Sequence, residues 1–424
     1  MKILILNLHS VKNAGDLVLN NTALQLIREE FPHAKITVSI NDLDETEKLD
    51  GPVTILPSWL YWMKFEHGRW HPQKSLAILW ALLRWRFTSG KQVQSQASDK
   101  EWQTLLNAYT SADIVMSCPG NFLYTSGFFS IPFLISCLTL QIAIWAKKPL
   151  YLLPQTIGPI TKWHEKRILS RILKQTRLIF VRDDISKTVT VDQLKIDSKK
   201  VKVVPDTAFA SQVQSTAAGL SLLAKYQVDP QRDKLVGITT INWGAQFEPF
   251  KGQKTYEAGL VMAIRNLIEQ NQVKVILFSQ VFGPNAASDD RKTAERVYNQ
   301  LQDLASNVLF IEEELDSNTL KSAYGAMDFF IGSRLHSNIF ALVQQIPVVA
   351  IQYQYKTAGI MTMAGLKDHV IKIEDVSPET MPQFLTDGYR QRDLLLKTIQ
   401  ASIPTLKQEA ASIIPTLRQD YESL

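Results

Sequence analysis

The chain of 424 residues is 45% hydrophobic and 21% charged, a balance that excludes a disordered chain and leaves room for two or three globular domains. Its formal net charge of +5 is too small to indicate nucleic acid as a partner, and no nucleic-acid partner is expected. The two cysteines, Cys118 and Cys137, show no metal-binding spacing, so they exclude a disulfide framework and favour a reducing compartment.

The first residues form a short apolar run, Met1–Leu8, without the longer apolar core and cleavage site of a secretory signal. We therefore interpret it as the first buried strand of a cytoplasmic protein. Similar runs rich in Val, Ile and Leu recur at Ile3–Asn7, Lys35–Ile40, Asp113–Ser117, Leu150–Leu153, Leu178–Val181 and Val201–Val204. A second series lies at Leu235–Thr240, Val273–Ser279, Val308–Ile311, Phe329–Ile331 and Val348–Ile351. Runs that are apolar on both faces predict parallel strands covered by helices.

Strands and helices that alternate throughout predict an α/β, doubly wound architecture. The two series of strands are separated by Ser211–Asp233, which starts polar and ends in Asp-Pro and a charged turn, so we place a domain boundary there. The predicted organisation is a Rossmann-like domain over residues 1–210, a second over 230–375 and a helical segment over 376–424. The two domains are expected to face a cleft, with ligands beyond the carboxyl ends of their strands.

One segment, Phe128–Ala146, is nearly uncharged and about long enough to span a bilayer. It lies between two predicted strands of the first domain, and a helix in that position must pack on the sheet. We therefore predict a buried crossover helix and no membrane span here.

A tryptophan-rich insertion covers about residues 57–90. It contains five of the nine tryptophans, namely Trp59, Trp62, Trp70, Trp80 and Trp85. Between Trp59 and Lys91 there are six Lys or Arg and one Glu, so this segment alone equals the positive excess of the whole chain. Trp, Leu and Arg side by side are typical of helices at a membrane surface. Two interpretations stay open: Trp80 and Trp85 simply pack on the first domain, or the segment makes peripheral contact with a membrane or the acceptor.

The stretch Asp328–Leu342 places polar residues between a predicted strand and a predicted helix. Gly332 and Ser333 permit a tight turn, and Arg334 and His336 follow where the helix begins. Free N–H groups and the helix dipole favour anions at such a position. Arg334 adds a planar fork of donors that matches phosphate or carboxylate. The pattern predicts a binding site for a small anion.

The same block resembles the most characteristic signature of the polysaccharide pyruvyl transferase family. The matching residues are Gly-Ser-Arg334-Leu-His336-Ser, then Pro347 and Tyr355-Lys356-Thr357. Further pieces match in the expected order, at Asn13–Asp16, Pro154–Pro159, Val181–Asp183 and Pro205–Asp206, so the resemblance runs from residue 1 to about 370. The chain departs from the family at Cys118–Asn121, which has one Gly where a glycine-rich turn is usual, and this loop is expected to hold a different acceptor.

The resemblance implies a transferase with two facing Rossmann-like domains, as in glycosyltransferase-B folds, followed by C-terminal helices. It implies phosphoenolpyruvate as the donor substrate, and no metal or cofactor is expected. The implied product is a pyruvate ketal on a sugar of a polysaccharide or its lipid-linked precursor, with release of phosphate. The donor carries a phosphate and a carboxylate, for which Arg334 and Arg182 are the expected clamp. An ion pair with Asp183 or Asp184 is the alternative for Arg182.

The ketal chemistry needs an acid for the enol carbon and a base for the attacking hydroxyl. His336 fits the acid, because the free pKa of imidazole is ~6.5, and binding the phosphate is its other open role. Asp16 is the predicted base, with capping of the following helix as its alternative. Lys356 is expected near the donor phosphate unless it is simply solvated, and Ser333 and Leu335 are expected to contact the donor.

His9, after the first strand, and Asn121 are the predicted contacts to the saccharide acceptor. Two other functions stay open. A glycosyltransferase of the same architecture would use a nucleotide sugar in exopolysaccharide synthesis, since an Arg and a helix N-terminus also hold a diphosphate. A non-catalytic carbohydrate- or lipid-binding module is disfavoured by Arg182, Arg334 and His336. The sequence does not name the acceptor sugar.

Overall fold

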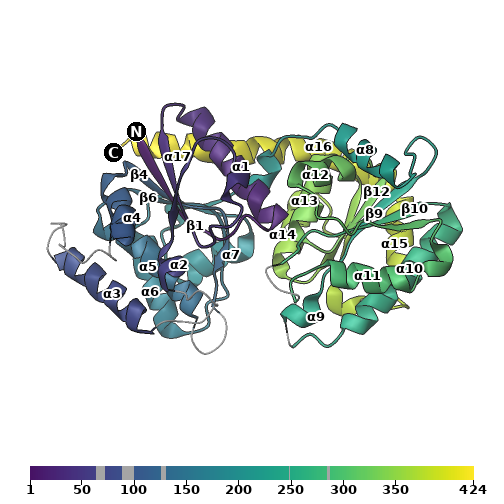
Figure 1. The fold of residues 1–424 in the computed structure, drawn as a ribbon, viewed down its shortest axis with the longest axis horizontal. Helices are drawn as coiled ribbons and strands as arrows, with labels where there is room; N and C mark the ends of the chain where they lie inside the picture. Colours follow the sequence, from purple (N-terminus) through teal and green to yellow (C-terminus); the bar gives the residue numbers. More distant parts are fainter. Residues whose placement is uncertain (64–71, 88–99, 126–129, 248, 284–286) are drawn as a thin grey trace. The chain divides into compact units, whose positions relative to one another are not determined.

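The computed structural model describes residues 1–63, 72–87, 100–125, 130–247, 249–283 and 287–424. The chain forms two compact units (Figure 1). Unit 1 consists of Met1–Val11, Leu19–Val204 and Ala411–Leu424, and unit 2 consists of Lys12–Val18 and Pro205–Ala410. The main passage between the units is therefore at Pro205, ahead of the polar stretch where the sequence places the boundary. Lys12–Val18 belongs to unit 2, although the residues on both sides of it belong to unit 1. Ala411–Leu424 belongs to unit 1, although it follows unit 2 in sequence.

Unit 1 is built on a parallel sheet with the strand order β3-β2-β1-β4-β6-β7-β8, and β5 pairs with β6. The strands are β1 (Lys2–Leu8), β2 (Lys35–Ile40), β3 (Thr54–Pro57), β4 (Ile114–Ser117), β5 (Gly120–Leu123), β6 (Leu150–Ile157), β7 (Ile179–Val181) and β8 (Val201–Val203). The helices are α1 (Ala14–Glu30), whose first turn belongs to unit 2, α2 (Trp59–Met63), α3 (Pro72–Phe87), α4 (Lys100–Ser111), α5 (Ile131–Trp145), α6 (Trp163–Gln175), α7 (Asp184–Thr188) and α17 (Ile413–Glu422). The order reverses between β1 and β4, which is where doubly wound sheets bind ligands.

Unit 2 repeats this plan with the strand order β11-β10-β9-β12-β13-β14, all parallel. Its strands are β9 (Leu235–Thr239), β10 (Lys274–Phe278), β11 (Val308–Phe310), β12 (Phe329–Gly332), β13 (Val348–Gln352) and β14 (Val370–Lys372). Its helices are α8 (Ala217–Lys225), α9 (Trp243–Gln246), α10 (Gln253–Asn271), α11 (Arg291–Asn299), α12 (Ser317–Tyr324), α13 (Leu335–Val343), α14 (Tyr355–Met363), α15 (Met381–Arg390) and α16 (Arg392–Ala411). Figure 1 shows α10, α11 and α15 on one face of this sheet and α8, α12 and α13 on the other. The strand order reverses between β9 and β12.

The predicted α/β fold with C-terminal helices is confirmed, and so are the eleven predicted strands, with ends that shift by a few residues. Sequence patterns missed β3, β5 and β14, which have only three or four residues each. β3 ends in Pro57, β5 starts with Gly120, and both residue types weaken a strand pattern. β3 and β14 are also edge strands, which need less apolar sequence than central ones.

The predicted crossover helix is α5, which is confirmed as part of the core of unit 1. Phe133, Leu140 and Ile142 from α5 pack in one cluster with side chains from the sheet and from α4 and α6. In the part of the chain that the structure describes, no helix has the length and hydropathy to cross a bilayer.

The tryptophan-rich insertion divides its side chains between the core and the surface. Trp59 is fully buried, and its Nε1 donates to the Tyr109 hydroxyl at 3.3 Å. Trp85 is also buried, whereas Trp80, on the same helix α3, is 72% exposed. Packing on the first domain therefore holds for Trp85 and fails for Trp80. Trp70 lies outside the described residues.

Helix α17 forms side-chain contacts with residues of unit 1 that lie far from it in sequence. The Asp420 carboxylate accepts a hydrogen bond from the Tyr151 hydroxyl at 2.8 Å and two from the Arg177 guanidinium at 3.1 Å. Arg418 forms an ion pair with Glu30 at the end of α1. Strand β6, the start of β7 and helix α1 are thus joined to residues more than two hundred positions away in sequence.

Candidate functional site

The turn after β12 carries the predicted anion site of unit 2. Arg334 is the residue that caps α13, with extended backbone dihedrals of φ −108° and ψ 141°. Asn338 braces the turn, because its side-chain N–H donates to the carbonyls of Gly332 at 3.2 Å and Arg334 at 3.1 Å. A Cβ at position 332 would lie 1.9 Å from Asn338 Oδ1. Glycine is therefore required here for space, and not for an unusual backbone angle.

Arg334 is held by a carboxylate that the sequence patterns did not single out. Its Nη2 donates to Asp290 Oδ1 at 2.5 Å and its Nε to both carboxylate oxygens at 3.0 and 3.2 Å. Asp290 is fully buried, and it also accepts from the backbone N–H of Val281 in the loop after β10. Burial alone would lower the pKa of Arg334, but Asp290 and Tyr353 outweigh it and raise that pKa. Arg334 is therefore a fixed cation.

Asp290 binds the Nε and Nη2 edge of the Arg334 guanidinium, and this fixes the direction in which the Nη1 edge points. The Nη1 atom lies 3.5 Å from Gln246 Oε1, and the guanidinium carbon is 5.9 Å from the centre of the Tyr353 ring. Lys356 Nζ lies 5.8 Å from the centre of the same ring. Burial favours the neutral phenol, but the charges of Lys356 and Arg334 outweigh it and lower the pKa of Tyr353. Arg334, which follows β12, and Lys356, which follows β13, thus both lie near the partly buried phenol of Tyr353.

An aromatic wall stands beside these charges. Trp243, at the start of α9, stacks on Phe247 with ring centres 5.2 Å apart and packs against Tyr353 at 4.8 Å. The Trp243 side chain is mostly buried, whereas Phe247 is about half exposed. The wall limits water on one side of Arg334, which strengthens the electrostatic interactions there.

The side chains of Ser333 and Leu335 point into the core of unit 2. The Ser333 hydroxyl lies 2.9 Å from the Tyr256 hydroxyl, and its backbone N–H donates to Thr239 Oγ1 at 3.1 Å. Leu335 is buried among the apolar residues of α13. These side chains shape the turn, and what Leu335 can offer a ligand is its backbone N–H in the first turn of α13.

His336 lies in the first turn of α13 against Gly15. A Cβ at position 15 would lie 2.1 Å from His336 Nδ1, so only glycine lets the first turn of α1 approach this imidazole so closely. Gly15 and Asp16 are in Lys12–Val18, the segment that belongs to unit 2. Asp16 is thus next in sequence to the residue that touches His336. The helix cap is not Asp16: Asn13 Oδ1 accepts from the Gly15 N–H at 2.9 Å. Asn13 therefore takes the role that the sequence left open for Asp16.

Arg182 follows β7 in unit 1 and is buried. Its Nε donates to Thr156 Oγ1 in β6 at 2.6 Å. The Asp183 carboxylate accepts from the backbone N–H of Ser186 at 2.6 Å and from the Ser186 hydroxyl at 3.0 Å, and so caps α7. The structure thus holds Arg182 at a strand end of unit 1, with the Thr156 hydroxyl as one of its partners.

The predicted acceptor residues His9 and Asn121 line one small pocket of unit 1. Its volume is about 80 Å³, and it lies beyond the carboxyl ends of β1 and β4, where the strand order reverses. The other lining residues are Asn7, Asn41, Leu60, Phe122, Tyr124, Ser130, Pro132, Phe133 and Ser136. Apart from His9, these side chains are uncharged: amides and hydroxyls alternate with aromatic rings.

Two backbone and side-chain details shape this pocket. Asn7 has φ 66°, in the left-handed region that Asn tolerates, at an irregular position of β1, and its Nδ2 donates to the Ser117 hydroxyl at 3.2 Å. Asn41 Nδ2 lies 3.4 Å from His9 Nδ1. Asn121 Oδ1 is buried and has no hydrogen-bond partner among the residues that the structure describes. An acceptor oxygen without a partner in a small polar pocket indicates a place for a ligand hydroxyl.

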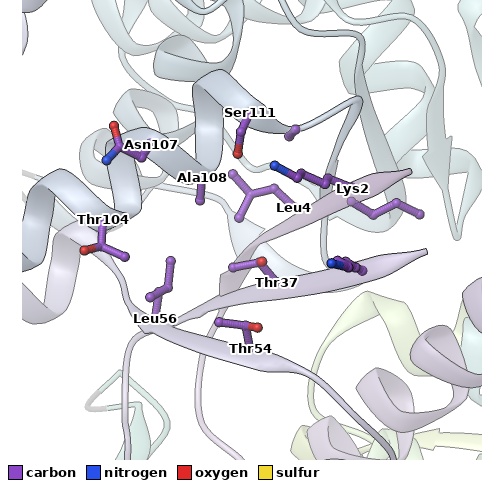
Figure 2. A pocket seen from close by; sticks show the side chains of 12 residues that line it. Lys2, Leu4, Thr37, Thr54, Leu56, Thr104, Asn107, Ala108 and Ser111 are labelled. Carbon is purple, nitrogen blue, oxygen red and sulfur yellow. The ribbon is translucent and has the colours of Figure 1, made fainter. Parts of the chain in front are cut away.

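A second hollow of about 290 Å³ lies at the other end of the same sheet (Figure 2). Thr37, Thr54 and Leu56 from the strands face Thr104 and Asn107 from α4, with Lys2 at one end. It contains none of the predicted site residues and lies at the amino ends of the strands, where parallel sheets do not build their sites. Among the described residues, no group of three His, Cys, Asp or Glu is placed to hold a metal ion.

A comparison with known families identifies the family of this chain. The family model described as polysaccharide pyruvyl transferase matches residues 13–355. The chain belongs to this family. The matched range includes the Arg334–His336 turn, Asp290 and the Tyr353 loop as well as Asn121.

The chain is also similar in sequence to a known exopolysaccharide protein. Amylovoran biosynthesis protein AmsJ of Erwinia amylovora is 25% identical over 236 residues, which are 55% of this chain. The chain spans only 56% of the length of AmsJ.

The solved structures show the fold. A putative UDP-N-acetylglucosamine 2-epimerase from Listeria monocytogenes has a TM-score of 0.61 at 12% identity, over 100% of this chain and 97% of its own. Anabaena Alr3699/HepE in complex with UDP-glucose has a TM-score of 0.55 at 16% identity, over 98% and 100%. A glycosyltransferase from Rickettsia africae has a TM-score of 0.59 at 12% identity, over 99% and 98%. The predicted glycosyltransferase-B-like fold is thereby confirmed.

Proposed function

We propose that this pyruvyl transferase moves the pyruvate group of phosphoenolpyruvate onto two hydroxyls of one sugar as a ketal, with release of phosphate. The acceptor is a polysaccharide or its lipid-linked precursor, in exopolysaccharide synthesis. The observation that carries the proposal is the Arg334 turn: a cation oriented by a buried carboxylate, directly before helix α13, whose second residue is His336. No cofactor or metal is part of the proposal.

The donor fits the charges of the unit 2 strand ends. Arg334 presents its Nη1 edge beside the Tyr353 ring, and Lys356 brings a second cation to the same ring. The first turns of α13 and α14 add backbone N–H groups that favour anions. Phosphate and carboxylate groups are the anions that such charge-assisted donors bind best. Arg182 supplies the second fork of the proposed clamp from its own strand end.

The reaction needs one proton to arrive and two to leave. In the proposed sequence His336 gives a proton to the methylene carbon of the enol, which becomes a methyl group, and the neighbouring carbon becomes an oxocarbenium-like centre. A sugar hydroxyl attacks that centre and gives its proton to Asp16. The second hydroxyl of the same sugar then displaces phosphate and gives its proton to the departing phosphate, which closes the ketal. The contact between Gly15 and His336 supports this assignment, because it puts Asp16 in the same unit as His336 and next to the residue that touches it.

The acceptor fits the small pocket of unit 1. A pyranose offers hydroxyls and apolar C–H faces, and the pocket offers amides, hydroxyls and the rings of Phe122 and Tyr124. Asn121 and His9 are proposed to bind the acceptor there. A pocket lined almost wholly by neutral groups favours a neutral sugar over a uronic acid.

Mass spectrometry of acceptor oligosaccharides after incubation with enzyme and phosphoenolpyruvate tests the proposal. The expected product gains one pyruvate ketal, and release of phosphate depends on the saccharide. Arg334→Lys and His336→Gln should remove the product. Arg291→Lys is the matched control, since Arg291 also forms a bidentate pair, with Asp289, but lies nearer the surface at the start of α11 and outside the Arg334 turn. Loss of product in the control as well would mean that the loss is not specific to Arg334.

Nucleotide sugars provide the discriminating comparison, because the fold is shared with enzymes that bind UDP. We expect phosphoenolpyruvate to raise the melting temperature of this protein and UDP-sugars to leave it unchanged. Stabilisation by a UDP-sugar alone would contradict the pyruvyl donor.

A further inference from the structure

Helix α3 is apolar on two opposite faces, and the structure covers only one of them. Ile78, Leu82 and Trp85 are buried in the core cluster of unit 1, where α3 packs on α2. Leu76 and Trp80 are 65% and 72% exposed, and Leu79 and Leu83 are also exposed. Among the described residues, no other helix exposes more than two large apolar side chains. Figure 1 shows α3 at the periphery of unit 1.

The exposed residues form one continuous stripe. At about 100° of rotation per residue, the four side chains of Leu76, Leu79, Trp80 and Leu83 fall within about 100° of arc. Arg84 and Arg86 are exposed and lie on the two sides of this stripe, each about 70–90° from its centre. The buried side chains occupy the opposite side of the helix. A surface helix normally exposes its polar side, so solvent exposure does not explain this stripe.

The composition of the stripe fits a lipid surface. Trp is favoured at the headgroup level of a bilayer, Leu inserts below it, and Arg pairs with anionic headgroups. The sequence from Trp59 to Lys91 carries six Lys or Arg against one Glu, so the surroundings of α3 share the sign that such a membrane attracts. A helix of 16 residues is too short to span, and its other face is already committed to the core. We therefore propose that α3 docks unit 1 onto an anionic membrane surface, lying parallel to it with Leu76, Leu79, Trp80 and Leu83 inserted.

Docking of this kind is independent of the donor chemistry, and it has a consequence for the acceptor. A pyruvyl transferase bound to a membrane encounters lipid-linked saccharides at a high local concentration. Membrane binding does not raise the local concentration of a free polysaccharide. The arginines act through attraction to headgroups, so binding should weaken as salt rises.

Sedimentation with lipid vesicles tests the proposal on the full chain. We expect the protein to bind vesicles of equal parts phosphatidylglycerol and phosphatidylcholine at low salt, and to bind pure phosphatidylcholine vesicles much more weakly. Trp80→Gln should weaken vesicle binding by about tenfold. Trp80→Phe keeps an aromatic ring and should bind vesicles nearly as well as the wild type. Arg84→Gln and Arg86→Gln should each weaken binding to the anionic vesicles by about fivefold. All four variants change exposed side chains, so their melting temperatures should match the wild type.

Trp163 supplies the matched control, because it is 74% exposed on α6 in the same unit and lies outside the stripe. Trp163→Gln should leave vesicle binding unchanged. The proposal is overturned if the wild type ignores anionic vesicles, or if Trp163→Gln weakens binding as much as Trp80→Gln does. It is also overturned if light scattering shows a dimer that Trp80→Gln dissociates and vesicle binding is absent, since a second copy of the chain would then cover the stripe.

Discussion

The two sheets follow one strand order, yet their carboxyl edges carry different chemistry. In unit 2 the loops after β10, β12 and β13 bring together Asp290, Arg334 and Lys356, around an aromatic wall. In unit 1 the end of β1 and strand β5 bring Asn7 and Asn121 together with other, mostly uncharged, side chains around a pocket of about 80 Å³. The charged edge suits a small anion and the neutral edge suits a sugar. The same scaffold thus holds two kinds of site, because the loops set the chemistry and the strand order sets the place.

The buried Asp290–Arg334 ion pair distinguishes the charged edge of unit 2 most clearly from the neutral edge of unit 1. Its removal should have the largest effect on stability and turnover. Asp290→Asn leaves the Arg334 cation buried without its carboxylate, which should cost about 3–5 kcal/mol of unfolding free energy and abolish turnover. Urea unfolding measures the loss. Asp303→Asn is the control, because the Asp303 pair with Arg265 lies on the surface and should contribute far less. A loss for Asp290→Asn no larger than for the control would mean that the pair is well solvated.

The close approach of Gly15 to His336 belongs to unit 2 alone, and Gly15→Ala should disturb it. The added methyl group overlaps the imidazole, so we expect kcat to fall by about 100-fold through misplacement of His336. Steady-state kinetics of Gly15→Ala measure the fall in kcat. In a His336→Gly background both the imidazole and the Cβ that the methyl group would meet are gone, so Gly15→Ala should then cause little further loss of unfolding free energy. Urea unfolding of the four proteins gives the coupling, since the His336 variants are expected to be inactive. Additive losses would show that Gly15 acts by another route.

Asn121 sharpens the comparison from the neutral edge. Asn121→Ala should raise the KM for the acceptor by about two- to tenfold and leave the KM for phosphoenolpyruvate unchanged, since one neutral hydrogen bond is lost. Asn107→Ala, in the hollow at the other end of the sheet, is the control (Figure 2). A change in the donor KM alone would place Asn121 on the donor side and remove the contrast between the two edges.

His9 should give the smallest effect of the four. It is exposed, and its contact with Asn41 is long, at 3.4 Å, so His9→Gln should change the acceptor KM by about twofold at most. Steady-state kinetics with varied acceptor check this. A change much larger than that for Asn121→Ala would make His9 the main acceptor contact.

The parts of this protein that sequence could predict are those set by short-range patterns. A run of Val and Ile is enough to place β9 or β13, and Arg334 and His336 are two residues apart in a strand-to-helix turn. The Asp290–Arg334 pair could not be predicted, because it joins loops after different strands and Asp290 looks like an ordinary residue before α11. The Gly15–His336 contact depends on a crossing of the chain between units that no local pattern encodes. Asn13, and not Asp16, caps α1 because the helix begins at Ala14, so Asn13 directly precedes it whereas Asp16 lies inside its first turn.

The surface of α3 was also beyond prediction, for a different reason. The sequence of α3 is apolar around most of its circumference, so its periodicity does not say which face meets the core. The structure resolves this by burying Trp85 and exposing Trp80. Trp85 joins the core cluster that also contains Leu60 and Met63 of α2, and this packing makes the two tryptophans differ.

The contacts of Asp420 with Tyr151 and Arg177 have a consequence for biosynthesis. Domains usually fold one after another as the ribosome releases them. Here the strands of unit 1 are made first, but their partner Asp420 is translated only after all of unit 2. The sheet of unit 1 therefore lacks its contacts with Asp420 until unit 2 has been synthesised. In a nascent chain stalled before residue 411, the polar groups of Tyr151 and Arg177 would be without this partner and open to chaperone binding.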